Sequence, residues 1–214
     1  MKNAVILAPI ALLLPSIGHA QSDAVLYVGV EGGVDNYELN AEGDLGIFDP
    51  SLAGTTASFD GLSGNGATGK IYAGYQVPFN GGFGALEAFG GYSGASISAS
   101  LSDGVDTYSA KIQARESYGV AARAGVKVSN SSAVYARLGW VNTRFKGTID
   151  DSVDVFTDSS NEDAIQYGAG LDTMIGPKTS LRAEYVISDY GDAGLGSGVS
   201  LKNGAFHAGL SFRF

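Results

Sequence analysis

The chain has 214 residues, no cysteine and a formal net charge of −9 at pH 7. The excess of acid argues against nucleic acid as a partner, because binding phosphates needs clustered Lys and Arg, and the lack of cysteine excludes thiol catalysis and Cys-based metal sites. Gly is abundant, with 32 residues, whereas Pro has only 5, a balance that favours strands and tight turns over a disordered linker.

The first twenty residues have the features of a secretory signal peptide. Lys2 supplies the positive charge, residues 4–14 are apolar, and Gly18 and Ala20 are the small residues of a cleavage site. A retained anchor helix is the alternative, but the apolar run is shorter than the about 20 residues that cross a bilayer as a helix. We therefore expect residues 1–20 to be a signal peptide and residues 21–214 to form one domain, whose place the following segments indicate.

Eight later segments alternate apolar and polar residues with a period of two, which indicates strands with unlike surroundings on their two faces. In chain order they are 26–34, 70–77, 86–92, 117–127, 134–140, 165–172, 181–188 and 205–214. The last is the clearest. Phe206, Leu210 and Phe212 share its apolar face, and His207 and Arg213 share its polar face.

The connections between these segments alternate in length. Three are short, at 78–84, 129–132 and 176–179, and four are long, at 38–65, 98–110, 146–163 and 190–203. A barrel inserted from the periplasm has short turns inside and long loops outside. Because an open sheet edge in hydrocarbon leaves backbone groups unpaired, the first and last segments should pair. The sequence thus predicts an all-β fold, an eight-stranded antiparallel transmembrane β-barrel.

Alternation alone does not tell the inside of a barrel from its outside, and a soluble barrel with an apolar interior is the alternative. The polar face carries charges of both signs separated mainly by glycine, which suits a narrow interior where charges pair. The expected interior charge network consists of Glu31, Lys70, Glu87, Arg123, Arg137, Asp172, Arg182, Glu184 and Arg213.

The apolar face carries its larger amphipathic rings near the ends of the segments, as the aromatic girdles of membrane barrels do. These rings are Tyr75, Tyr92, Tyr118, Trp140, Tyr167 and Tyr185. Their placement favours an apolar face that meets lipid.

Three stretches carry a resemblance to a known family: Leu26-Tyr27-Val28-Gly29, the run from Gly69 to Gln76, and the run from His207 to Phe214. With them the chain resembles the small outer-membrane β-barrels of Gram-negative bacteria, the porin-family, OmpA-barrel and opacity-type proteins. The terminal Phe214 is similar to the signal that the barrel assembly machinery reads. The resemblance implies an integral outer-membrane location, with outer-membrane lipid and lipopolysaccharide as partners, and it implies location more firmly than activity.

Signals for an enzyme are poor. His207 is the only histidine after residue 20, and its place in the alternation points inward. Outer-membrane lipid A deacylases, which this chain resembles in size, use a His-x-Ser pair near an acid, but here Ala208 and Gly209 follow. We expect no catalytic residue and no cofactor. A structural or surface-interaction role is favoured, a narrow channel for small solutes is the alternative, and a lipid-A-modifying enzyme is the less favoured third hypothesis.

The long connections are rich in acid. Hard cations such as calcium prefer oxygen ligands, which makes Asp150, Asp151, Asp154 and Asp158 weak candidates for cation contact, although their spacing does not match an EF-hand. The alternative is a solvated, charged surface loop. These acidic connections are also where we expect a surface ligand to bind, if the protein has one.

Overall fold

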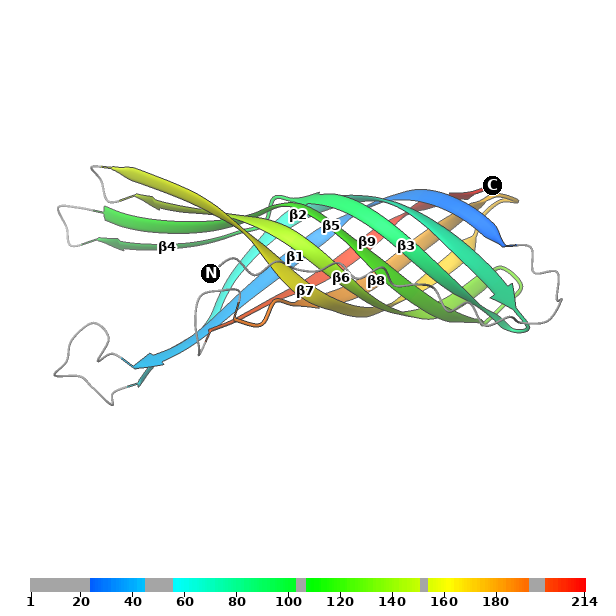
Figure 1. Cartoon of the computed structure of the whole chain (residues 1–214), viewed down its shortest axis with the longest axis horizontal. Helices are drawn as coiled ribbons and strands as arrows, with labels where there is room; N and C mark the ends of the chain where they lie inside the picture. Colours follow the sequence, from blue (N-terminus) through cyan, green and yellow to red (C-terminus); the bar gives the residue numbers. More distant parts are fainter. Residues whose placement is uncertain (1–23, 45–55, 103–106, 151–153, 193–198) are drawn as a thin grey trace, which may run out of the picture.

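The computed structural model describes residues 24–44, 56–102, 107–150, 154–192 and 199–214. These residues form nine strands, which run obliquely around one elongated barrel (Figure 1). The strands are β1 (Val25–Asp44), β2 (Thr56–Phe79), β3 (Gly82–Ser93), β4 (Ser96–Ser102), β5 (Thr107–Lys127), β6 (Ser132–Asp150), β7 (Val155–Met174), β8 (Thr179–Asp189) and β9 (Val199–Arg213).

The strands close into a ring of eight. Antiparallel pairs run in the order β1, β2, β3, β5, β6, β7, β8 and β9, and β9 returns to β1. β3 and β4 act as one ring strand that is interrupted at Gly94 and Ala95, since both pair with β5. The prediction of an eight-stranded antiparallel barrel is confirmed, and so is the pairing of its first and last strands.

The two ends of the barrel differ. One end, here called the turn end, holds the short connections at residues 80–81, 128–131 and 175–178, as predicted. The amide of Phe214 donates to the carbonyl of Leu26 there, so both ends of the barrel chain lie together. The turn between β2 and β3 is only Asn80 and Gly81, and the positive φ of 82° at Gly81 is one that glycine adopts without strain.

The opposite end, here called the hairpin end, shows that the predicted long loops were wrong in extent. β1 continues to Asp44 and β2 begins at Thr56, so most of 38–65 is a paired hairpin, and 98–110, 146–163 and 190–203 also contain paired strand. Beyond the bilayer a strand needs no apolar residues on its outer face, so the apolar-outward alternation that marks the membrane segments ends there although the backbone pairing continues. Residues 1–20 and Asp151 lie outside the described residues.

The hairpin end separates into two sheets. β7 pairs with β8 only from Ile165 onward, so its residues 155–164 pair with β6 alone. Similarly, residues 56–66 of β2 pair with β1 alone, because the last backbone bond on the other edge of β2 joins the Gly94 amide to the Ala67 carbonyl, and β4 pairs with β5 alone. One sheet therefore contains β2, β1 and β9, and the other contains β4, β5, β6 and β7, as two groups of projecting strands show in Figure 1.

The faces of the barrel are the reverse of those of a soluble protein. Apolar side chains cover the outside, where Ile71 is 67% and Leu138 is 61% exposed, whereas Arg182 is completely buried and Glu184 is 2% exposed. A surface of this kind is stable in hydrocarbon and not in water. The soluble-barrel alternative is therefore wrong. In the described residues no helix has the length and hydropathy needed to cross a membrane.

Interior aromatic rings lie across glycines on the neighbouring strand. Tyr27 pairs in register with Gly74, and Tyr72 pairs with Gly29. A Cβ atom at either glycine would overlap the ring of its partner. The same relation joins Tyr135 on β6 to Gly170 on β7. Much of the glycine in this sequence thus makes room for large side chains inside a narrow barrel.

Candidate functional site

The charged side chains of the interior meet around Arg182 on β8. Its Nη1 lies 3.3 Å from Glu31 Oε1 on β1 and 3.0 Å from Glu87 Oε1 on β3. The three side chains are almost completely buried. Because a buried charge is tolerated only when it is paired, these contacts fix the distance between strands that are not neighbours.

Lys70 makes the second link. Its Nζ lies 2.8 Å from Glu31 Oε2 and 2.7 Å from Glu184 Oε1. Glu31 and Lys70 are direct register partners on β1 and β2, whereas Glu184 lies on β8. One ammonium group therefore bridges two carboxylates across the interior, with charge-assisted hydrogen bonds.

Glu87 holds two arginines together. Arg123 and Arg137 are register partners on β5 and β6, an arrangement of like charges that would be unfavourable alone. Arg123 Nε lies 2.6 Å from Glu87 Oε2, and Arg137 Nη1 lies 3.5 Å from Glu87 Oε1. Arg137 Nη1 is also 3.7 Å from Glu184 Oε2. The carboxylates between the two guanidinium groups offset their repulsion.

Asp172 extends the chain of charges toward the turn end. Arg213 Nη2 lies 3.4 Å from Asp172 Oδ1, and Arg123 Nη1 lies 4.0 Å from Asp172 Oδ2. The side chain of Arg213 is 23% exposed, so this pair is at the rim. All nine sequence-predicted residues thus lie in one connected set of ion pairs, which we call the charge network, and each of the eight ring strands contributes to it.

Aromatic side chains complete the network, and sequence reasoning missed them. Tyr135 donates a hydrogen bond of 2.9 Å to Glu184 Oε2, and Arg123 Nη2 donates one of 3.2 Å to the Tyr27 hydroxyl. The guanidinium carbon of Arg182 lies 4.1 Å from the ring centroid of Tyr72, a cation–π contact. These tyrosines share the parity of the charged residues on their strands, and that signal could have identified them.

His207 lies in a small chamber on the hairpin side of the network. Its Nε2 is 3.8 Å from Asp35 Oδ1, and its Nδ1 is 4.0 Å from Glu184 Oε1. The chamber has a volume of about 40 Å³, and Lys70 and Asn203 are among the residues that line it. A polar cavity of this size holds at most a few water molecules.

Glu31, Glu184 and His207 are the one group of three in the described residues whose oxygen and nitrogen atoms come close enough for a metal ion. The Lys70 ammonium lies within 2.8 Å of both carboxylates and supplies their counter-charge. The donor set therefore fits an ion pair with lysine better than a metal ion.

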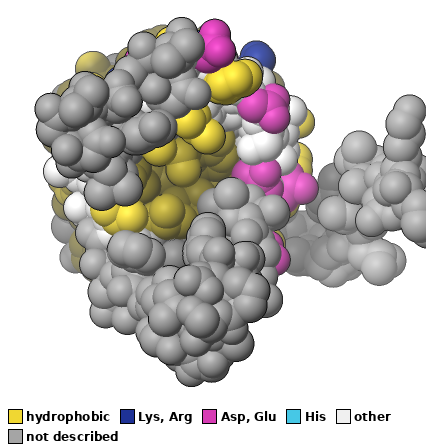
Figure 2. All heavy atoms as spheres, turned by 90° about the vertical axis from the view of Figure 1, so that its left-hand side faces the viewer, with side chains coloured by type: hydrophobic (Ala, Val, Ile, Leu, Met, Phe, Trp, Pro, Cys, Tyr) yellow, Lys and Arg dark blue, Asp and Glu magenta, His cyan; other side chains and the backbone are white. Residues whose placement is uncertain are grey.

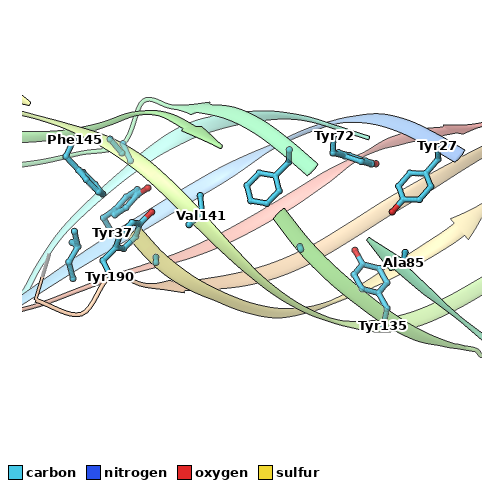
Figure 3. Packing of buried hydrophobic residues seen from close by; sticks show 14 of the residues in the cluster. Tyr27, Tyr37, Tyr72, Ala85, Tyr135, Val141, Phe145 and Tyr190 are labelled. Atoms are coloured by element: carbon cyan, nitrogen blue, oxygen red, sulfur yellow. The ribbon is translucent and has the colours of Figure 1, made fainter. Parts of the chain in front are cut away.

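Three aromatic rings close the interior beyond this chamber, and we call them the aromatic plug: Tyr37, Phe145 and Tyr190 (Figure 3). The ring centroids of Phe145 and Tyr190 are 5.3 Å apart, and those of Tyr37 and Phe145 are 5.7 Å apart, both edge to face. Thr143 and Tyr190 share a hydrogen bond of 2.8 Å between their hydroxyl groups. All are buried, so the plug is a packed layer.

Three of the four acidic candidates for cation contact lie in the described hairpin of β6 and β7. Asp150 ends β6, Asp154 precedes β7, and Asp158 lies within β7, where its Oδ1 accepts a hydrogen bond from the amide of Ser159. Within the described part of the chain these three acids do not form a group with the spacing of metal ligands. The predicted loop is largely a hairpin, in which Asp158 lies opposite Gly147 and Asp150 lies opposite Val155.

Comparison with known proteins places the chain in a family. A family model for the outer membrane protein beta-barrel domain matches residues 7–214. The chain belongs to this family. It is therefore an integral outer-membrane β-barrel, as its apolar exterior requires. No curated protein matches the chain.

Solved structures of outer-membrane barrels are similar to it. Ail, the attachment invasion locus protein of Yersinia pestis, was crystallised with the heparin analogue sucrose octasulfate; it has 17% identity and a TM-score of 0.43, and the match covers 88% of this chain and 99% of Ail. Neisserial surface protein A has 16% identity and a TM-score of 0.47, over 88% of this chain and 97% of that protein. The Escherichia coli outer membrane protease OmpT has 9% identity and a TM-score of 0.43, over 91% and 98%.

Proposed function

We propose that this outer-membrane barrel has a structural and surface-interaction role and that its interior does not conduct solutes. The observation that carries the proposal is the charge network, in which Arg182 on β8 meets Glu87 on β3 across the lumen. Eight strands enclose a space that side chains can fill. A solute could pass only if several buried ion pairs separated, and each unpaired charge would be costly in this setting.

Two further layers support a closed interior. The chamber next to His207 has only about 40 Å³ of free volume, and the aromatic plug packs above it. A narrow channel for small solutes, the alternative, would need a continuous polar path. The interior instead has a layer of paired charges and, beyond it, a layer of aromatic rings. The phenol ring of Tyr190 is buried in the aromatic layer.

The position of His207 supports a non-catalytic role. The side chain is buried among Asp35, Lys70 and Glu184 inside the barrel, where a lipid substrate in the membrane has no access. A lipid-modifying enzyme of this size would place its base on the outer face. This is why the third hypothesis is disfavoured.

We also propose that the hairpin end faces outward and contacts lipopolysaccharide there. Tyr118 and Trp140 lie on the outer face with ring centroids 5.9 Å apart, as expected at a membrane interface. Beyond them lies one polar groove of about 330 Å³, which we call the basic groove because three cations, Arg115, Arg144 and Lys146, outnumber the two acids that also line it, Glu116 and Asp158. Cationic side chains just outside an aromatic girdle are placed to bind phosphate groups of the outer leaflet.

Planar-bilayer recording on the protein purified from outer membranes of cells expressing the full chain tests the closed interior. We expect no reproducible conductance steps at moderate voltage. Steps of one defined size, present with this protein and absent with detergent alone, would favour the channel and contradict the proposal. Folding of the same sample is checked by gel mobility before and after boiling, since a folded barrel migrates differently.

A further inference from the structure

The inward-facing positions change in character at the hairpin end. Along β1 the inward residues Glu31, Asp35 and Tyr37 are followed by Leu39, and along β9 His207 and Asn203 are followed in the same direction by Leu201. Inward apolar residues at this end together form what we call the apolar cup. It consists of Leu39, Ile97, Ile112, Phe145 and Leu201, from β1, β4, β5, β6 and β9.

The cup encloses a cavity of about 170 Å³ between the two sheets of the hairpin end. Leu39 and Leu201 lie in the sheet of β2, β1 and β9, and the other three residues lie in the sheet of β4 to β7. Figure 2 looks onto this end and shows hydrophobic side chains in the hollow, with Asp and Glu side chains beside it. The cavity therefore opens at the end of the barrel that we place at the cell surface.

The cavity is not filled by its own walls. Gly147 on β6 lines it next to Phe145, and a Cβ atom at Gly147 would have no neighbour nearer than 3.9 Å, the carbonyl oxygen of Asp158. Leu39 and Ile112 remain partly exposed although they face inward. Exposed apolar walls around free volume, in a barrel whose other inward layers are tightly packed, are typical of a ligand site.

The floor of the cup is closed. Phe145 belongs both to the cup and to the aromatic plug, where it packs edge to face against Tyr37 and Tyr190. A molecule that enters the cup thus meets aromatic rings and then the charge network below them. The site suits retention of a ligand at the surface, and passage through the barrel is blocked.

We propose that the apolar cup binds a small uncharged hydrocarbon, with the size of a single aromatic ring. An apolar cavity of about 150 Å³ lined by Leu, Ile and Phe stays dry and takes up benzene. This cavity has a similar volume, and its five apolar wall residues are Leu, Ile and Phe, whereas the β7 side is polar, with Asp158, Ser159, Ser160 and Glu162. Asp158 and Glu162 lie at the cavity, and their carboxylates disfavour anions such as fatty acids. An uncharged ring makes aliphatic and edge-to-face contacts and leaves no polar group unpaired.

The test uses isotope-labelled protein, purified from membranes of cells expressing the full chain and placed in lipid nanodiscs, with toluene as the probe. We expect saturable binding, with NMR shifts concentrated at the methyl groups of Leu39, Ile97, Ile112 and Leu201. Octane and octanoate form the second arm. Octane tests whether a flexible acyl chain is the better occupant, and octanoate tests the exclusion of anions.

Two variants separate binding in the cup from partition into lipid. Gly147→Leu places a side chain in the free volume, and we expect it to weaken toluene binding by about tenfold or more while leaving the barrel folded. Val155→Asp is the matched control, because Val155 is exposed at the start of β7 and does not line the cavity. It should bind toluene like the unchanged protein.

The outcomes decide the proposal. Non-saturable shifts spread over the lipid-facing methyl groups, or equal binding by Gly147→Leu, would overturn it. Tighter saturable binding of octane or octanoate than of toluene would also overturn it, in favour of an acyl chain. Heat-modifiable gel mobility of each variant shows that a loss of binding is not a loss of fold. None of these outcomes bears on whether the barrel conducts solutes. The proposal of a closed interior and the proposal of a hydrocarbon site can therefore be contradicted independently.

Discussion

Arg182 and Glu87 lie on opposite sides of the barrel, and their side chains meet at 3.0 Å in its centre. β8 and β3 are four steps apart in either direction around the ring of eight strands. No backbone hydrogen bond joins these two strands, so the side chains themselves hold the two walls at one separation. The proposal of a closed interior rests on this contact across the lumen.

Replacing Arg182 with Met should destabilise the barrel strongly. The change leaves Glu87 and Glu31 buried without their shared guanidinium group, and breaking a buried pair in this way costs about 3–5 kcal/mol. Urea unfolding in lipid vesicles, followed by gel mobility, measures the effect.

Arg213→Met is the matched control for this prediction, because Arg213 is at the rim and has one acidic partner. Its cost should be about 1 kcal/mol or less. Equal costs for the two variants would show that burial of the network does not stabilise the barrel. In the double variant Glu87→Gln with Arg182→Met, the loss should be smaller than the sum of the two single losses.

Replacing Gly74 with Ala should disturb the interior although the added group is one methyl. The new Cβ would overlap the Tyr27 ring, whose hydroxyl accepts a hydrogen bond from Arg123. We expect a loss of about 1–3 kcal/mol in unfolding free energy, as for other overpacked sites. Gly69→Ala on the same strand is the control, since its Cβ would have no neighbour nearer than 3.9 Å. Equal unfolding free energies for the two variants would contradict the explanation that Gly74 is needed to make room for the Tyr27 ring.

Removing charge from the basic groove should weaken contact with lipopolysaccharide. We expect the variant Arg144→Gln with Lys146→Gln to retain less lipopolysaccharide during purification and to bind it with weaker salt dependence, because fewer phosphate contacts are made. Phosphate content per barrel after washing at increasing salt measures this. The control is Lys178→Gln, which removes one exposed cation at the turn end. Identical retention by all three proteins would rule out the groove as the contact.

The eight alternating segments predicted the ring of strands and the residues of the charge network, because a lipid exterior and a charged interior impose opposite demands on adjacent residues. The partner of each charge was not predictable. That Lys70 meets Glu184, 114 residues away, depends on which strands face each other after closure.

The hairpin end was harder to predict. At the hairpin end of β1 the apolar residues Tyr37 and Leu39 face inward and Glu38 lies between them, the reverse of the membrane part, where the apolar residues face outward. The apolar parity therefore changes within the strand, and an alternation of one parity ends before it. The apolar cup was missed for a related reason, since Leu39 and Leu201 come from stretches that we assigned to loops. The interior tyrosines Tyr27 and Tyr72 occupy inward positions in the sequence alternation. They were missed because the network was predicted from charged residues only, and a tyrosine carries no charge.

Crosslinking of β1 to β9 tests closure of the membrane barrel most directly. The chain has no cysteine, so Val30→Cys with Leu210→Cys creates one defined pair at register partners on the outer face. With a short bismaleimide, purified protein should form an intramolecular link that changes its mobility after boiling. Val30→Cys with Leu171→Cys, on the distant β7, should not. Absence of the first link, or equal formation of both, would contradict a barrel closed between its first and last strands.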